Sequence, residues 1–305
     1  MSKLILLILL PLISIRPASG QAIYELVHDK QVKGHIVGSA HDKIRGISHR
    51  YFKLVEEVIA KSDALLIESI PSKQPDIVAR EKLYASQGIT LRILAEKENH
   101  ECLQTLIRDW DAKWKMPLSY LIDWGPAAFF HTFVQAVFSS EVGQRDHVNS
   151  LDSHIYKSFL NRYSIIELEG WTGTVEASLK LDPEEYGRTA EAYCKVSTAP
   201  GYPQKQHLAD VRLLMNALEK GENDQFRRHY EFIQKQIGWS DKTLYQNLGY
   251  RDRKNAKAIH EHLQSGKHKS PMIVVGAVHL GGADGLLNNL RSMGYTVQQY
   301  RPDQK

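Results

Sequence analysis

Two histidines and a glutamate stand where apolar runs of this sequence end. Near the N-terminus, "HIVGSAHDK" leads an apolar run into Gly38 and places His41 three residues later. Close to the other end, "PMIVVGAVHLGG" repeats the pattern with Gly276 and His279, while the run "ALLIES" contains Glu68. Two imidazoles and a carboxylate are a common ligand set for a divalent metal ion. Such an ion activates water and polarises a carbonyl, so this set predicts a hydrolase that needs no serine or cysteine nucleophile.

Simpler structural roles exist for the same residues. A histidine after a strand often caps a turn or faces solvent, and the chain has 14 histidines. Glu68 alone would serve as an ion-pair partner at a sheet edge. The HExxH and G-x-S-x-G motifs of common hydrolases are absent from the sequence. The matched pair of Gly-x-x-His motifs is what favours a metal site.

Strands at the two ends of the chain must position these residues. Residues 32–37 read as a strand, residues 47–59 show helical apolar spacing, and residues 64–68 read as a second strand. This order predicts a βαβ unit with a right-handed crossover and two parallel, paired strands. The C-terminus repeats the order, with strands at 272–275 and 295–300 and a helix from about Asp284, closed by Gly294 as a left-handed cap.

The middle of the chain is mostly helical. Helix-like spacing or composition occurs around residues 96–113, 118–138, 150–162, 174–193, 207–219, 223–237 and 252–265, with one β-like run at 164–170. No stretch has the composition of a linker. The sequence therefore predicts one α/β domain over residues 21–305, with a mixed, partly parallel sheet, two βαβ-type ends and many flanking helices.

Functional groups in a parallel sheet collect beyond the carboxyl ends of its strands. We expect Gly38 and Gly276 to let the backbone turn sharply there. His41 and His279 would then lie in one crevice, and Glu68 would emerge at the same edge.

The first twenty residues resemble a secretory signal peptide. They contain one early positive charge at Lys3, an apolar run over residues 4–15 and small residues before a cleavage site after Gly20. This run is shorter than the roughly 20 residues of a spanning helix. We therefore expect a periplasmic or secreted protein with no stable membrane anchor after cleavage.

Charge and cysteine content restrict the partners. The chain has 39 basic and 35 acidic residues, and removing residues 1–20 leaves 37 basic residues against 35 acidic ones. This near balance, without a basic block, argues against nucleic-acid binding. Cys102 and Cys194 are either a disulfide or two buried thiols. The sequence does not indicate an oligomeric state.

Several stretches resemble the TraB/GumN family, which includes bacterial exported proteins and the animal Tiki proteases. "VGSAH" resembles its first Gly-x-x-His motif and "ALLIES" its strand that ends in glutamate. "SLDSHIYKSFLNRYSIIELEG" resembles its central block, with Asp152, Leu168 and Glu169, and "YRDRKNAKAI" a block that normally reads Arg-Asn. "VGAVHLGGADGLLNNLRSMGYTV" is close to its C-terminal signature and is the most specific of these matches.

Two positions depart from the family pattern. Asp252 follows Arg251 where the family has asparagine, which exchanges an amide that can donate a hydrogen bond for an acceptor. Gly170 follows Glu169 where the family has threonine. The three candidate metal ligands are unchanged.

The resemblance implies an EreA/ChaN-like α/β fold and a metal-dependent peptidase. His41, Glu68 and His279 would bind the metal, with manganese or cobalt favoured over zinc, and the substrate would be a peptide or protein. Arg251 is a candidate for stabilising an oxyanion or gripping a substrate carboxylate, or else for a structural ion pair. Glu169 is a candidate fourth ligand or general base, or else a carboxylate at the sheet edge.

We therefore predict an exported divalent-metal-dependent hydrolase, specifically a peptidase. Two alternatives remain open from the sequence. One is a non-catalytic periplasmic protein that binds metal, haem or a peptide. The other is an accessory to envelope polysaccharide export, in which the histidines would matter only for folding.

Overall fold

A computed structural model describes most of the two ends of the chain and parts of its middle. The described residues are 21–39, 48–70, 101–102, 104–105, 150–170, 184–185, 188, 191–192, 195, 213, 216–236 and 238–302. The predicted signal peptide, His41 and most of the helices predicted between residues 96 and 219 lie outside them. Within this part of the chain, no helix combines the length and the apolar character needed to cross a membrane.

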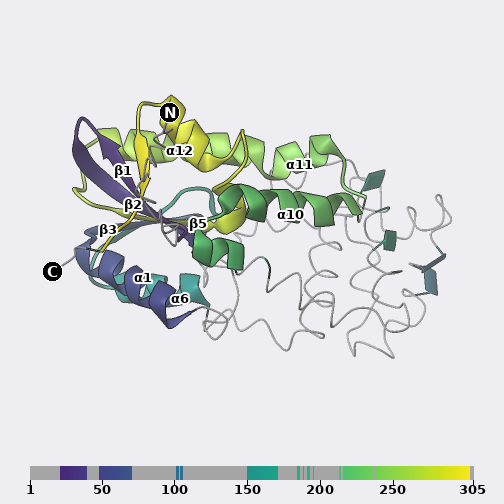
Figure 1. The fold of residues 1–305 in the computed structure, drawn as a ribbon, viewed down its shortest axis with the longest axis horizontal. Helices are drawn as coiled ribbons and strands as arrows, with labels where there is room; N and C mark the ends of the chain where they lie inside the picture. The colour runs from purple at the N-terminus through teal and green to yellow at the C-terminus, as the bar shows by residue number, and fades with distance from the viewer. Residues whose placement is uncertain are drawn as a thin grey trace, which may run out of the picture.

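A six-stranded mixed sheet forms the centre of the fold, with strand order β4-β3-β5-β2-β1-β6 (Figure 1). The strands are β1 (Ile23–His28), β2 (Gln31–Ser39), β3 (Ala64–Ile67), β4 (Ser164–Glu167), β5 (Met272–Gly276) and β6 (Thr296–Gln299). Strands β2, β5, β3 and β4 pair in parallel, whereas β1 is antiparallel to both β2 and β6. The predicted α/β class with a mixed, partly parallel sheet is confirmed. The EreA/ChaN-like likeness stays a prediction.

The central position of β5 corrects one expectation. Strands β2 and β3 point the same way, as predicted, but they do not pair with each other, because β5 lies between them. Ile273 of β5 is opposite Ile36 on one side and Leu66 on the other. All five residues of β5 are buried, as a strand covered on both faces requires. The C-terminal motif is thus inserted between the two N-terminal strands.

Strand β1 was not predicted. It forms a hairpin with β2 through Asp29 and Lys30, whose φ angles are 51° and 63°. Two central residues with positive φ are typical of the type I′ turn, which matches the twist of the flanking strands.

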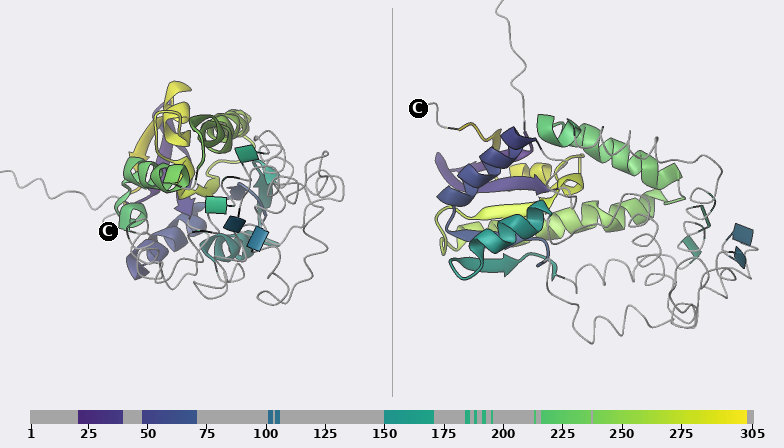
Figure 2. Two further views of the ribbon diagram at one scale, coloured as in Figure 1. Left: turned by 90° about the vertical axis from the view of Figure 1, so that its right-hand side faces the viewer. Right: turned by 90° about the horizontal axis from the view of Figure 1, so that it is seen from below.

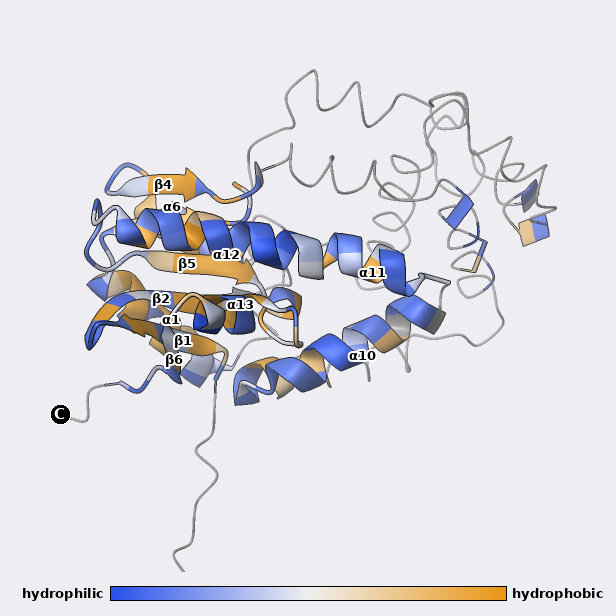
Figure 3. Ribbon diagram, turned by 90° about the horizontal axis from the view of Figure 1, so that it is seen from above, coloured by the Kyte–Doolittle hydropathy of each residue, from blue (hydrophilic) through white to orange (hydrophobic). Residues whose placement is uncertain are grey.

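Helices cover both faces of the sheet (Figures 1 and 2). One core layer packs α1 (His49–Lys61) and α6 (Leu151–Phe159) against side chains such as Val37 and Val274. The other packs α12 (Gly249–Gln264) and α13 (Leu286–Ser292) against the alternate side chains, such as Ile36 and Ile273. The apolar strands are therefore enclosed by amphipathic helices, and in Figure 3 β4 and β5 are mostly hydrophobic whereas α12 is mostly hydrophilic.

Two further helices, α10 (Asn223–Gln236) and α11 (Asp241–Asn247), extend from the carboxyl edge of the sheet, and α11 leads directly into α12 (Figure 3). The predicted helices at 150–162, 223–237 and 252–265 correspond to α6, α10 and α12. Cys102 is in a disulfide, and the chain's other cysteine, Cys194, lies outside the described residues.

The glycines of the two Gly-x-x-His motifs serve close packing rather than sharp turns. Neither has a positive φ, and Gly38 lies inside β2, opposite Val275. A Cβ atom on Gly38 would lie 2.7 Å from Cδ1 of Leu280. The expectation of a sharp backbone turn at Gly38 is therefore wrong, and its missing side chain instead makes room for the residue that follows His279.

Candidate functional site

Glu68 directly follows β3 and lies beside the end of β5. Its Oε2 accepts a hydrogen bond of 3.0 Å from the backbone N–H of Gly276. Its Oε1 lies 3.3 Å from Nε2 of His279. A Cβ atom at Gly276 would lie 3.3 Å from the His279 ring, so glycine leaves space for both groups. The structure therefore brings Glu68 and His279 together, as the sequence predicted, while His41 lies outside the described residues.

His279 ends a short 3₁₀ helix, η4 (Ala277–His279), and is almost fully buried. Its Nδ1 lies 2.6 Å from Oδ1 of Asp252, and its Nε2 faces Glu68. Burial opposes a charge on the imidazole, but the Glu68 and Asp252 carboxylates outweigh it and raise the pKa of His279 to about 9.

Asp252 lies in the first turn of α12 and is 0% exposed. Its second oxygen, Oδ2, accepts a hydrogen bond of 2.9 Å from Nη1 of Arg227. Burial raises the pKa of Asp252, and the cations of His279 and Arg227 act in the opposite direction. Both oxygens of this buried carboxylate therefore have partners.

Arg227 extends from α10 into the interior and is only 2% exposed. Besides Asp252, its guanidinium donates to the carbonyl of Val278 at 3.1 Å, to Glu231 at 2.6 Å and to Asp284 at 3.3 Å. Burial opposes its charge, but the surrounding carboxylates outweigh burial, and its pKa is raised. This arginine joins α10 to α12 and to the segment that carries His279.

Arg251, one residue before Asp252, bridges two strands. Its Nε and Nη2 donate to the two oxygens of Glu169 at 2.8 and 2.5 Å, and Nη2 also donates to Glu68 at 2.5 Å. The Glu169 side chain, just beyond β4, is 1% exposed. Despite burial, the two carboxylates raise the pKa of Arg251 above its ordinary value, so the guanidinium stays charged.

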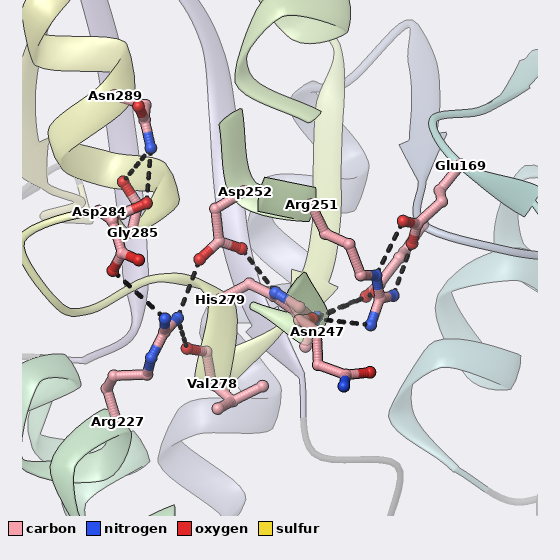
Figure 4. Close-up of polar contacts among 12 residues, drawn as sticks. Glu169, Arg227, Asn247, Arg251, Asp252, Val278, His279, Asp284, Gly285 and Asn289 are labelled. Atoms are coloured by element: carbon pink, nitrogen blue, oxygen red, sulfur yellow. Dashed lines mark hydrogen bonds and ion pairs between the residues drawn. The ribbon is translucent and has the colours of Figure 1, made fainter. Parts of the chain in front are cut away.

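These contacts form one row of alternating charges across the carboxyl edge of the sheet (Figure 4). In spatial order the row comprises Glu169, Arg251, Glu68, His279, Asp252 and Arg227. Four of these six residues were predicted as site residues: Glu68 and His279 from the strand ends, and Glu169 and Arg251 with the family resemblance.

His279 and Glu68 are the predicted metal ligands that lie within the described residues. A metal-binding histidine usually donates its other ring N–H to a carboxylate, which fixes the tautomer and the ring orientation. Asp252 supplies that carboxylate at Nδ1, and Nε2 is thereby directed at Glu68. Among the described residues no group of three His, Cys, Asp or Glu side chains is arranged to hold a metal; the third predicted ligand, His41, is not one of them.

The end of β2, which leads to His41, is also anchored. The hydroxyl of Ser39 donates to Oδ2 of Asp152 at 2.6 Å, and both residues are buried. Asp152 lies in the first turn of α6, where it ties this helix to the strand. The Asp of the central sequence block thus helps position the edge of the sheet.

Sequence reasoning missed the roles of Asp252 and Arg227. Asp252 was noted only as an acid in place of an amide, and its burial against His279 supplies a reason for an acceptor there. The sequence does not indicate that Arg227 belongs to the site. Arg228, the next residue, is of the same type, and only the fold shows which of the two points inward.

Comparisons with known proteins agree with the motifs. The model of the TraB/PrgY/gumN family matches residues 23–299, nearly the whole chain. No curated protein and no solved structure matches this chain. The matched span runs from β1 to β6 and includes every residue of the row described above. The chain therefore belongs to the TraB/PrgY/gumN family.

Proposed function

We propose that this protein is an exported, divalent-metal-dependent hydrolase that cleaves peptides. The observation that carries the proposal is the orientation of His279. A buried carboxylate binds its Nδ1 at 2.6 Å, and its Nε2 lies 3.3 Å from a second carboxylate. The contact at Nδ1 supports the proposal, because a metal-binding histidine usually donates its other ring N–H to a carboxylate.

His279, Glu68 and His41 would hold the ion. When bound, manganese or cobalt would supply a Lewis acid that lowers the pKa of water and polarises a carbonyl. Glu68 keeps its orientation through Gly276 N–H and Arg251, which bind its two oxygens. His279 keeps its orientation through Asp252.

Arg251 is suited to stabilising negative charge on the substrate. Its guanidinium is fixed by two carboxylates and stays charged, so it needs no reorganisation when charge develops nearby. Glu169 is buried and both its oxygens bind Arg251. This geometry favours a role for Glu169 in holding Arg251 over a role as ligand or general base.

Export and peptide substrates rest on the sequence. Residues 1–20 have the layout of a signal peptide, and the resemblance to the Tiki proteases supports a peptidase. N-terminal sequencing of the mature protein should begin at or near Gln21. A mature protein that retained Met1 would contradict export by signal cleavage.

Metal analysis of the purified protein, combined with a peptide-library digest with added manganese or cobalt, tests the activity. We expect bound metal and cleavage in the wild type. His41→Ala and His279→Ala should each lose metal and activity while keeping the fold, and excess metal should partly rescue the single variants but not the double variant.

A folded, metal-free double variant with full activity would overturn the mechanism. A wild-type protein that binds metal but cleaves no peptide would support the alternative of a binding protein.

A further inference from the structure

We propose that Arg227 and Asp252 are a matched positioning pair that directs Nε2 of His279 toward Glu68 and strengthens it as a ligand. Neither residue would touch the metal or the substrate. The inference rests on the proposed function, because it concerns how the same site is held. It goes beyond that function by assigning a role to an arginine on α10, outside the motifs.

The contacts of one nitrogen carry the argument. Nη1 of Arg227 donates both to Oδ2 of Asp252, at 2.9 Å, and to the carbonyl of Val278, at 3.1 Å. Asp252 binds the ring of His279, and Val278 is the residue before it in the chain. The arginine thus fixes the histidine from two sides, through its side-chain partner and through its backbone (Figure 4).

The pair also explains why an acid stands at position 252. An amide there could still accept a hydrogen bond from Nδ1 of His279 through its oxygen. Its NH₂ group would then face Nη1 of Arg227, and two donors would meet at a site that is 0% exposed. A buried arginine therefore requires the carboxylate, and a buried carboxylate requires the arginine.

Two further carboxylates, those of Glu231 and Asp284, bind the Arg227 guanidinium. Glu231 and Asp284 bind Nε and Nη2, and their side chains are about one-third exposed. They touch the same guanidinium but neither His279 nor Asp252 among the contacts of the described residues. Glu231 therefore offers a matched control, since its loss removes a charge from Arg227 without altering the contact to Asp252.

Four variants separate positioning from general stability: Asp252→Asn, Arg227→Met, the double variant Arg227→Met/Asp252→Asn, and Glu231→Gln. Manganese and cobalt affinity would be measured by calorimetry and stability by thermal unfolding. Loss of a carboxylate partner of a metal-binding histidine typically weakens metal binding by about 10–100-fold. We expect a loss in that range for Asp252→Asn, with a lower Tm, and no change in affinity for Glu231→Gln.

The double variant decides the question. It removes both buried charges and leaves an amide that still accepts from His279, so we expect its Tm to recover relative to either single variant. Its metal affinity should remain about 10-fold or more below that of the wild type, because an amide is a weaker acceptor than a carboxylate. A double variant with recovered Tm and wild-type affinity would show the pair to be only structural.

A readout that needs no metal separates this proposal from the proposed function. In the metal-free wild type, the Nδ1–H proton of His279 should give a strongly downfield NMR resonance because it is held by a carboxylate. The resonance should move upfield in Asp252→Asn and stay in place in Glu231→Gln. If the wild type binds no metal, the proposed function fails, and the NMR shift still supports the positioning pair. An unchanged resonance in Asp252→Asn would overturn the pair.

Discussion

Arg251 shows how a single side chain can join elements that are far apart in the sequence. It donates three short hydrogen bonds to two carboxylates, which follow β3 and β4. The planar guanidinium permits this, because its donors point in fixed, divergent directions. A lysine carries the same charge but has a single ammonium group, which cannot reproduce the paired contact with Glu169.

Arg251→Lys should therefore lower stability as well as turnover. We expect a loss of about 1–3 kcal/mol in the free energy of unfolding, the range for lost hydrogen bonds to charged groups. Under the proposed function turnover on peptides should fall too, since the lysine would not be fixed beside the substrate as Arg251 is. Urea unfolding and a peptide-cleavage assay measure the two effects. Unchanged stability would mean that the contacts to Glu68 and Glu169 contribute little in solution.

His35 lies in the middle of β2, opposite Met272 at the start of β5, and is almost completely buried. Burial lowers its pKa, Glu25 acts in the opposite direction and Lys61 in the same direction. Ser270 and the edge of the Tyr300 ring also face this imidazole. The folded protein thus prefers the neutral ring more than the unfolded chain does.

This preference predicts a pH dependence of stability. The pKa of His35 in the folded protein lies below the ordinary value of 6.5. Well above pH 6.5 the ring is neutral in both the folded protein and the unfolded chain, so it does not lower stability. Below pH 6.5 the unfolded chain takes up the proton more readily, and stability falls as the pH drops. The contribution of His35 to the free energy of unfolding should decrease as the pH drops from 6.5 to 5. His279 acts with the opposite sign, between about pH 9 and pH 6.5, because its pKa is raised, so urea titrations of wild type and His35→Gln are compared below pH 6.5. His35→Gln should reduce that slope, and equal slopes in both proteins would contradict the assignment.

At the scale of elements, the sequence predicted most strands but not their neighbours. Residues 272–275, 64–68 and 164–170 were predicted from apolar runs and correspond to β5, β3 and β4. Strand β1 was missed because its turn uses Asp29 and Lys30 rather than glycine. The insertion of β5 between β2 and β3 depends on long-range packing, which local patterns do not record.

The loop after η4 predicts a strong effect of one glycine. A Cβ atom on Gly281 would lie 2.3 Å from the backbone carbonyl of Asn223, at the start of α10. Backbone atoms cannot rotate away as a side chain does, so α10 and the loop would have to separate. We expect Gly281→Ala to lower the free energy of unfolding by about 1–3 kcal/mol or more.

Ala283→Ser, at an exposed position of the same loop, is the matched control and should change stability by less than about 0.5 kcal/mol. Thermal or urea unfolding compares the two variants. Equal stability of Gly281→Ala and wild type would show that α10 does not approach the loop this closely.

At the scale of the whole molecule, the two ends of the chain share one sheet. β5 pairs with β2 and β3, and β6 pairs with β1. Residues as distant in sequence as Glu68 and His279 meet because these strands interleave. That meeting was predictable, since functional groups collect at the carboxyl ends of parallel strands. The buried partners Asp252 and Arg227 were not, because their roles depend on which way each helix faces.

The interleaving predicts that the domain folds as one unit. A chain ending at Ser265 lacks β5, α13 and β6, and β2 and β3 would have no common neighbour. We expect this fragment to show no cooperative thermal transition by circular dichroism. A chain lacking only residues 303–305 is the control and should unfold like the full-length protein. Cooperative unfolding of the shorter fragment would show that the N-terminal strands fold without β5.

The position of β5 also has a consequence for biosynthesis. Ribosomes add residues from the N-terminus at about 5–20 per second, so β2 and β3 are made long before the strand that lies between them. Until residue 279 has been synthesised, the growing chain has Glu68 but no His279 beside it. A product that terminates before residue 279 therefore lacks the contact between Glu68 and His279. Under the proposed function, the chain would therefore gain activity only near the end of its synthesis.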